Sequence, residues 1–349
     1  MATLHVLREE FRLKNFGYNH PDPTAFWRSQ WGCWDIVHLT LRLILALYIV
    51  YAYIQEIVNY YLTAVNHDTL YTADKNTTNS TTNTTSSIDS SSSNTPGFEP
   101  ATLSTTTEYS MGPMVVEGWD TRRPWYVYLT IWSFTLLMAH LVLAALLAFV
   151  FTCRKEEEVL PMQDITGVEN AAYTGAEDDT TDRSSDTDAK PDIESPASSS
   201  DAPPLAWYFK LSWLLSDIVT PVSPIVTLIF FTAMWSGGTL DIYNANTHAM
   251  NSVLVFLDQV ISARPIRLLH VVAPIAYGLV YQSFNAVFWS FDHKEHVIYP
   301  GVIDWNMPGK TILNVCVIAF ILVPMSVFLW FLFYRLKLWI YAWRYEPVK

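Results

Sequence analysis

The stretch THAMNSVLVFLD, residues 247–258, carries polar side chains at helical spacing inside an apolar segment. His248 precedes Asn251 and Ser252 by three and four positions, and Asp258 follows Asn251 by seven. Residues at such offsets share one face of an α-helix. Two interpretations stay open: a chemical site whose pocket lining includes Asn251, Ser252 and Asp258, or a polar seam that hydrogen-bonds this helix to its neighbours.

A hydroxyl that could complete a chemical site lies in another apolar segment. Thr130 is about 8 Å inside the start of the segment that begins near Trp125, at 1.5 Å per residue. Thr247 is expected to N-cap a helix whose apolar body begins at Met250, which puts His248 at a similar depth. A hydroxyl beside an imidazole is a nucleophile–base pair, so Thr130 and His248 are the candidate catalytic residues.

These residues must be positioned by helices that cross a membrane. A span needs about 20 mostly apolar residues, and six segments come close to this. They are residues 36–54, 125–151, 207–235, 250–263, 268–289 and 312–334, of which 250–263 is the shortest. The expected fold is all-α, a polytopic transmembrane helical bundle of about six spans with two disordered inserts.

Several ionisable residues fall within these spans, where charge is costly. Such groups usually face the interior of a bundle. They are His38, Arg42, His140, Asp217, Asp258 and His270. We therefore expect them to serve either as functional groups or as interhelical polar contacts.

The composition agrees with a membrane protein. Of the 349 residues, 51% are hydrophobic and only 15% are charged, against about 25% charged in soluble domains. The net charge of −12 arises within residues 156–201, which hold fourteen acidic and two basic residues. No basic stripe exists to bind nucleic acid. The three cysteines stand apart, and no motif indicates a metal or a cofactor.

The distribution of charge predicts an orientation. Basic residues gather before the first span, after the second, at SARPIR (residues 262–267) and at the C-terminus. With six spans these places share one side, which the positive-inside rule makes cytosolic, so both termini are expected there. The segment after the first span then lies outside, where N-glycosylation sequons begin at Asn76, Asn79 and Asn83.

The predicted organisation follows from the spans and the inserts. A cytosolic segment (1–35) precedes a transmembrane domain (36–335), and a cytosolic tail (336–349) follows it. The domain is interrupted by an extracellular or lumenal Ser/Thr-rich loop (58–124) and an acidic cytosolic loop (152–205). Both inserts have compositions that are unsuited to a packed core.

Longer motifs carry a family resemblance. THAMNSVLVFLDQVISARPIRLLHVVAPIAYGLVYQSFNAVFWS (247–290), followed by YPGVIDWNMPGKTIL (299–313), resembles the rolling stone family of animals. WYVYLTIWSFTLL (125–137) and DPTAFWRSQW (22–31) fit the same family. The resemblance implies a multi-pass membrane protein that acts in cell–cell contact or myoblast-type fusion.

Rolling stone proteins are in turn distantly similar to the androgen-induced family of membrane threonine hydrolases, which cleave fatty-acid esters. The resemblance places their nucleophile at Thr130. Their His-Gly-Met-His-Thr motif matches HAMNS here, so that its first His falls on His248 and its catalytic second His on Asn251. Asn cannot accept and return a proton near neutral pH as imidazole does, which favours a pocket that has lost its base.

The sequence is compatible with three functions. The first is a non-enzymatic membrane protein of the rolling stone type, with membrane lipids and cell-surface or cytosolic proteins as partners. The second is a lipid ester hydrolase using Thr130 with His248, and the third is a channel or transporter. We favour the plasma membrane over the endoplasmic reticulum as the location, although sequons fit the lumenal side of both.

Overall fold

The computed structural model describes residues 8, 10–31, 35–84, 124–154, 204–235 and 242–345. Two compact units make up the chain, residues 54–125 and the remainder. The bundle and the site below belong to the larger unit. Most of the predicted Ser/Thr-rich loop from residue 85 onward, most of the acidic loop, and the outermost residues of both tails lie outside the described residues.

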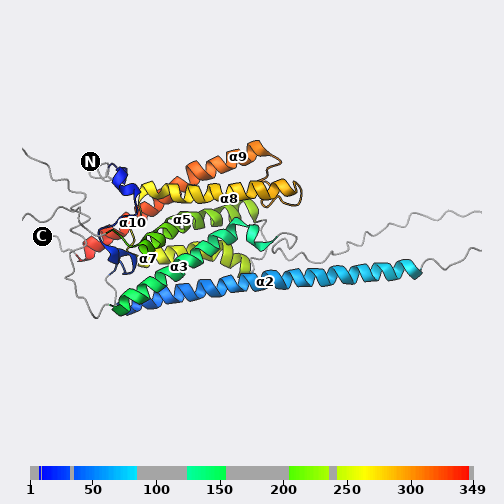
Figure 1. Cartoon of the computed structure of the whole chain (residues 1–349), viewed down its shortest axis with the longest axis horizontal. Coiled ribbons are helices and arrows are strands. Elements are labelled where there is room, and N and C mark those ends of the chain that lie inside the picture. Colours follow the sequence, from blue (N-terminus) through cyan, green and yellow to red (C-terminus); the bar gives the residue numbers. More distant parts are fainter. Residues whose placement is uncertain are drawn as a thin grey trace, which may run out of the picture. The chain divides into compact units, whose positions relative to one another are not determined.

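The described residues form helices and no strands, which confirms the all-α fold (Figure 1). In chain order the α-helices are α2 (Asp35–Thr84), α3 (Leu129–Cys153), α5 (Trp207–Ile229), α6 (Ile242–Asn244), α7 (Asn251–Ile261), α8 (Val272–Phe291), α9 (Pro308–Val317) and α10 (Val323–Tyr345). π-Helical segments extend three of them: η6 (Phe230–Met234), η7 (Ala245–Met250) and η9 (Ile318–Leu322).

Five helical stretches are long and apolar enough to cross a membrane. They are Asp35–Thr63, Leu129–Cys153, Trp207–Met234, Leu268–Phe291 and Pro308–Tyr345. The protein is therefore a membrane protein with several spanning helices. The predicted fourth span lies in α6, η7 and α7, which follow one another with 3, 6 and 11 residues. At 1.5 Å per residue this stretch is roughly 30 Å long. Its polar residues make it less apolar than the five spanning stretches, so it is not one of them.

The helix that contains residues 247–258 begins earlier than expected. It starts at Ile242, and Thr247 lies inside η7, where its hydroxyl donates to the Tyr243 carbonyl at 3.0 Å. The prediction that Thr247 is an N-cap is therefore wrong. A Thr hydroxyl can bond the carbonyl one turn back as readily as it caps a helix, and the sequence pattern does not distinguish the two.

Two helices run beyond their predicted ends. Helix α2 continues to Thr84, into the segment predicted as a loop from residue 58, so that the sequons at Asn76, Asn79 and Asn83 lie on helical backbone. No Pro or Gly interrupts this stretch, and each residue added to a formed helix gains a hydrogen bond. Likewise α10 continues through residue 345, into the predicted tail.

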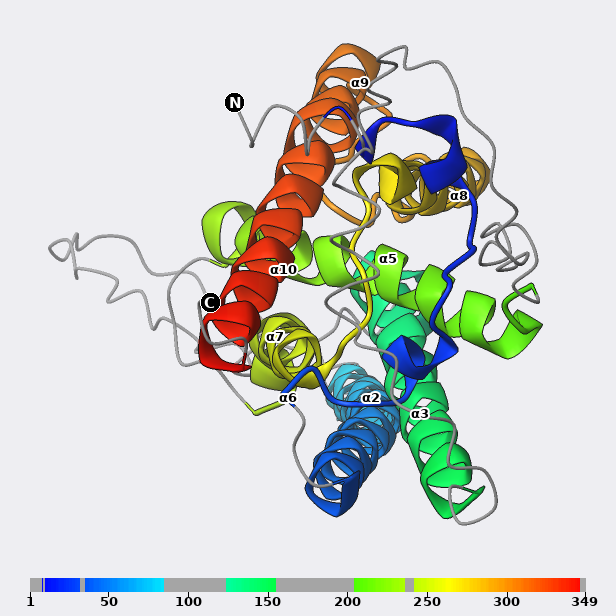
Figure 2. The ribbon, with the colours of Figure 1, turned by 90° about the vertical axis from the view of Figure 1, so that its left-hand side faces the viewer.

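Helix α5 is the central element of the bundle. It packs against α3, α7, α8 and α10, and Figure 2 shows it between these neighbours. One core cluster joins α2, α3, α5 and α7 through apolar side chains, among them Ile49, Phe134, Leu137 and Leu254. Outside lipid, the removal of apolar surface from water contributes about 25–30 cal/mol per Å² and is the main favourable term in helix packing. Inside lipid, close packing and polar contacts decide which helices associate.

The N-terminal segment closes one end of the bundle. Phe26 and Trp27 pack against Phe209 and Trp213 of α5. Trp31 Nε1 donates to the Val260 carbonyl at 2.7 Å, near the C-terminus of α7, where carbonyl groups lack helical partners. The end of α10 lies at this same end of the bundle (Figure 1).

Candidate functional site

The polar face of residues 247–258 divides among three environments. Asn251 and Ser252 contact α5: Ser223 Oγ donates to Asn251 Oδ1 at 3.0 Å, and the hydroxyls of Thr227 and Ser252 lie 2.6 Å apart. These two residues therefore form an interhelical seam. Such bonds typically contribute about 1 kcal/mol each within a membrane.

The seam continues along one face of α5. Gln259, two residues before the end of α7, donates through Nε2 to Thr220 Oγ1 at 3.0 Å and to Ser216 Oγ at 3.2 Å. With Ser223 and Thr227, these hydroxyl residues recur on α5 at intervals of four, three and four, which is one face of a helix. The seam fixes the register of α7 against α5.

Asp258 has a different role, at the centre of a buried ion cluster. Its carboxylate accepts hydrogen bonds from Arg42 of α2 and, at 3.0 Å, from Arg264 Nη2. His140 Nε2 of α3 lies 3.1 Å from its second oxygen. All four side chains are at most 2% exposed. A buried carboxylate needs such partners, because a desolvated charge without them costs several kcal/mol.

Two further groups complete this cluster. His38 Nε2 accepts from Arg42 Nε at 3.5 Å. Lys337 of α10, 2% exposed, donates to the carbonyls of Gln259 and Ser262 at 2.6 and 2.7 Å. A cation at the C-terminus of α7 meets carbonyls that have no helical partner and a favourable helix dipole. The cluster thus ties α2, α3, α7 and α10 together.

The remaining ionisable pair joins α5 to the start of the spanning stretch Leu268–Phe291. Asp217 Oδ2 lies 2.6 Å from His270 Nδ1. The ring of Tyr18, in the N-terminal segment, packs against His270 at a tilt of 33°, with ring centroids 4.5 Å apart. Burial, followed by the charge of Asp217, raises the pKa of Tyr18. All six ionisable residues singled out in the sequence are therefore buried and paired, as their cost in a membrane requires.

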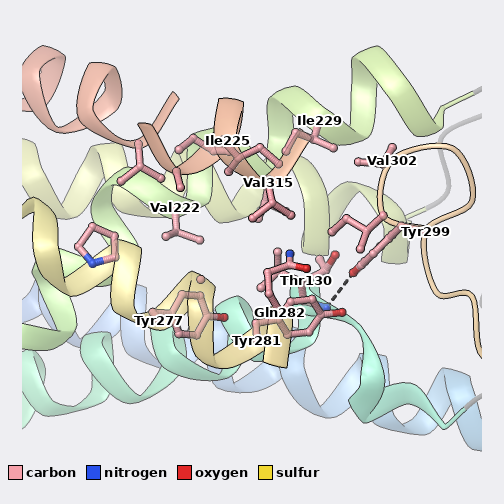
Figure 3. A pocket seen from close by; sticks show the side chains of 18 of the residues that line it. Thr130, Val222, Ile225, Ile229, Tyr277, Tyr281, Gln282, Tyr299, Val302 and Val315 are labelled. Carbon is pink, nitrogen blue, oxygen red and sulfur yellow. Dashed lines mark hydrogen bonds between the residues drawn. The ribbon is translucent and has the colours of Figure 1, made fainter. Parts of the chain in front are cut away.

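A cavity of about 110 Å³ lies between α3, α5, α8 and α9, with His248 of η7 also in its wall. Its walls are mostly aliphatic. Figure 3 shows Val222, Ile225 and Ile229 of α5 along one side. On the opposite side lie the polar groups of Thr130, Tyr277, Tyr281 and Gln282 (Figure 3).

Tyr299 joins the wall from the segment between α8 and α9. Its hydroxyl accepts a hydrogen bond from the Leu129 amide at 2.7 Å, the dashed line in Figure 3. The Thr130 side chain lies close to this hydroxyl. Burial raises the pKa of Tyr299, so that the phenol stays protonated. Because Tyr128 provides no side-chain cap, Tyr299 supplies an acceptor for the first turn of α3.

Thr130 and His248 line the same cavity, as their predicted depths allowed. The His248 ring stacks on Phe230, with centroids 3.6 Å apart and planes at 3°. Its Nδ1 atom is buried and has no partner among the described residues. No contact described in this part of the chain joins Thr130 directly to His248. The catalytic assignment of this pair stays a prediction.

The other predicted site residues lie elsewhere. Asn251, Ser252 and Asp258 are outside the lining of this cavity and make the seam and cluster contacts above. No group of three His, Cys, Asp or Glu side chains in the described part of the chain has a geometry that could hold a metal ion.

Sequence reasoning missed the cavity's tyrosines and the seam on α5. The hydroxyl spacing from Ser216 to Thr227 was a readable signal for the seam. Tyr277 and Tyr281 are four residues apart on one face of α8, which was readable too, but nothing local marks Tyr299 as their neighbour.

Comparisons with known proteins bear on the second half of the chain. Residues 195–345 match the family model described as protein rolling stone. Over 120 residues the chain is 25% identical to the protein rolling stone of Drosophila melanogaster. That match covers 32% of this chain and 42% of the relative, so that the chain spans less than half of the relative's length. No solved structure matches. His248 and Asn251 lie within the family match, whereas Thr130 lies before it.

Proposed function

Because residues 195–345 match the rolling stone family, we propose that the chain is a non-enzymatic multi-pass membrane protein that acts in cell–cell contact or myoblast-type fusion. The family resemblance implies this role. The predicted exposure of the segment that carries Asn76, Asn79 and Asn83 gives the chain a glycan-bearing surface outside the membrane. The plasma membrane is the location at which such a surface meets another cell.

The observation that favours a non-enzymatic protein is the neighbour of the Thr130 side chain. That neighbour is the hydroxyl of Tyr299, whereas a nucleophilic hydroxyl is activated by a base within about 2.6–3.2 Å. A protonated phenol is a poor base near neutral pH. Asn251, at the position of the hydrolases' catalytic His, is bonded to Ser223 and lies outside the cavity.

A cell-mixing assay tests the proposed role. Two cell populations carry complementary halves of a split cytosolic reporter, and the chain is expressed in neither, one or both. We expect reporter signal to rise with expression, and to be unchanged for Thr130→Ala and His248→Ala at equal surface levels. Correctly localised protein that leaves the signal at background would contradict a role in fusion, and unchanged cell aggregation would contradict a role in contact.

A lipid ester hydrolase is the second candidate, favoured by one observation: Thr130 and His248 line a single cavity. In this mechanism His248 takes the hydroxyl proton while Thr130 Oγ attacks the ester carbonyl, and the alcohol leaves with that proton. Water then hydrolyses the acyl-threonine ester, which releases the fatty acid and restores the hydroxyl. Fluorophosphonate labelling in native membranes separates the candidates, with a known threonine hydrolase as positive control. Labelling that disappears in Thr130→Ala would establish the hydrolase and overturn the non-enzymatic proposal.

A further inference from the structure

The cavity between α3, α5, α8 and α9 has the size of a small ligand fragment. Its volume is about 110 Å³, and an apolar protein cavity of about 150 Å³ can bind benzene. It is therefore large enough for the end of an acyl chain or one ring of a larger molecule. Aliphatic side chains such as Val222, Ile225 and Ile318 form most of its wall, which suits an apolar occupant.

Two polar atoms in the wall are without partners. His248 is 8% exposed and its Nδ1 has no hydrogen-bond partner among the described residues. Gln282 Oε1 is also buried and unpaired in the described part of the chain. Leaving such an atom unpaired costs about 1–3 kcal/mol, so buried polar groups almost always have partners. Both residues line the cavity, where a bound molecule would be in position to supply the missing bonds.

The wall also defines what kind of polar group fits. None of the described residues that line the cavity is Lys, Arg, Asp or Glu. A phosphate or carboxylate placed there would lose its hydration without gaining a cation, which is strongly unfavourable. A hydroxyl group both donates and accepts, so it can satisfy neutral acceptors and donors such as those of Gln282 and Tyr277.

We propose that this cavity binds an uncharged lipid through a hydroxyl group, which donates to Gln282 Oε1 and bonds to His248 Nδ1, and through an apolar chain or ring beside it. Monoacylglycerols and sterols both have this chemistry. Only a part of the lipid is enclosed, and the rest of the molecule remains outside the cavity. Lipid binding in this cavity requires neither hydrolysis nor a role in cell contact, so a test of it does not depend on the proposed function.

A photoaffinity experiment on the full chain in phosphatidylcholine nanodiscs tests the proposal. The probe is a monoacylglycerol that carries a diazirine and an alkyne on its acyl chain, and the comparison probe is the free fatty acid with the same chain. We expect at least tenfold stronger labelling by the uncharged probe, with the crosslinks on cavity-lining peptides. Unlabelled monoacylglycerol and unlabelled sterol are the two competitors, and the one that reduces labelling identifies the class of lipid.

The chain offers a matched pair of variants. Gly278 lines the cavity, and a Cβ atom added there meets nothing within 4 Å, so Gly278→Leu fills the space without a backbone clash. Gly309 near the start of α9 has the same freedom and lies outside the cavity, so Gly309→Leu is the control. Labelling should fall at least tenfold in Gly278→Leu and remain unchanged in Gly309→Leu.

His248→Phe provides a second test that leaves the cavity volume nearly unchanged. The ring can still stack on Phe230, but it loses its hydrogen-bonding nitrogens, and affinity should fall about fivefold for one lost hydrogen bond. Equal labelling of wild type and a folded Gly278→Leu would overturn the proposal. So would equal labelling by the fatty-acid probe, an absence of competition by both lipids, or an unchanged affinity in His248→Phe.

Discussion

His140 Nε2 lies 3.1 Å from Asp258 Oδ2, a contact that joins α3 to α7 across 118 positions of the chain. Arg42 and Arg264 bind the same carboxylate. Asp258 is therefore the counter-ion of two buried cations, one on α2 and one in the segment that follows α7. The cluster holds the bundle together at a depth where none of these side chains reaches solvent.

Replacing Asp258 should destabilise the protein strongly. Asp258→Asn leaves two buried guanidinium groups without their carboxylate, and breaking one side of a buried ion pair typically costs about 3–5 kcal/mol. Thermal unfolding of the purified protein in detergent measures the effect. The exposed charged residue Lys310 provides the control variant Lys310→Gln, which should unfold at the wild-type temperature. Equal unfolding temperatures for both variants would show that the cluster does not stabilise the fold.

Tyr299 should stabilise the start of α3 through its hydroxyl. Tyr299→Phe keeps the ring but removes the acceptor for the Leu129 amide, and losing a helix-capping acceptor costs about 1 kcal/mol. Faster amide exchange at residues 129–131 is the expected result, together with a small fall in unfolding temperature. Tyr51→Phe, on an exposed ring, should change neither quantity. Unaltered exchange in Tyr299→Phe would mean that another group caps this helix.

The turn after α8 should respond to acid. Backbone amides of Glu295 and Lys294 donate to Asp292, which lowers the pKa of this carboxyl below its ordinary value of 3.8. A lowered pKa in the folded state stabilises the turn above pH 3.8, and this contribution is lost as the pH falls through the lower, folded value. Amide exchange of residues 293–296, corrected for intrinsic rates, should therefore accelerate on acidification in wild type. In Asp292→Asn the same turn should show no such dependence, and a dependence that persisted there would assign it to another group.

The sequence by itself determined the fold class, and it also determined that the charged residues within the spans must have partners inside the bundle. Long apolar runs fix helices, because only internally hydrogen-bonded segments cross a membrane. Charged residues in such runs must be paired, so the burial of Arg42, His140 and Asp258 was predictable even though their partners were not. The rolling stone motifs at 247–290 and 299–313 were also readable in the chain, and both lie within the family match over residues 195–345.

Only the tertiary structure decided what each polar residue of 247–258 does. The helical period gives the direction of a side chain around its own helix, but it does not say which helix lies in that direction. The π-helical turn of η7 also alters the angles that a regular α-helix predicts. Asn251 therefore meets Ser223, Asp258 meets Arg42, and His248 meets the cavity, because contacts between distant segments depend on how the helices pack and on no local pattern.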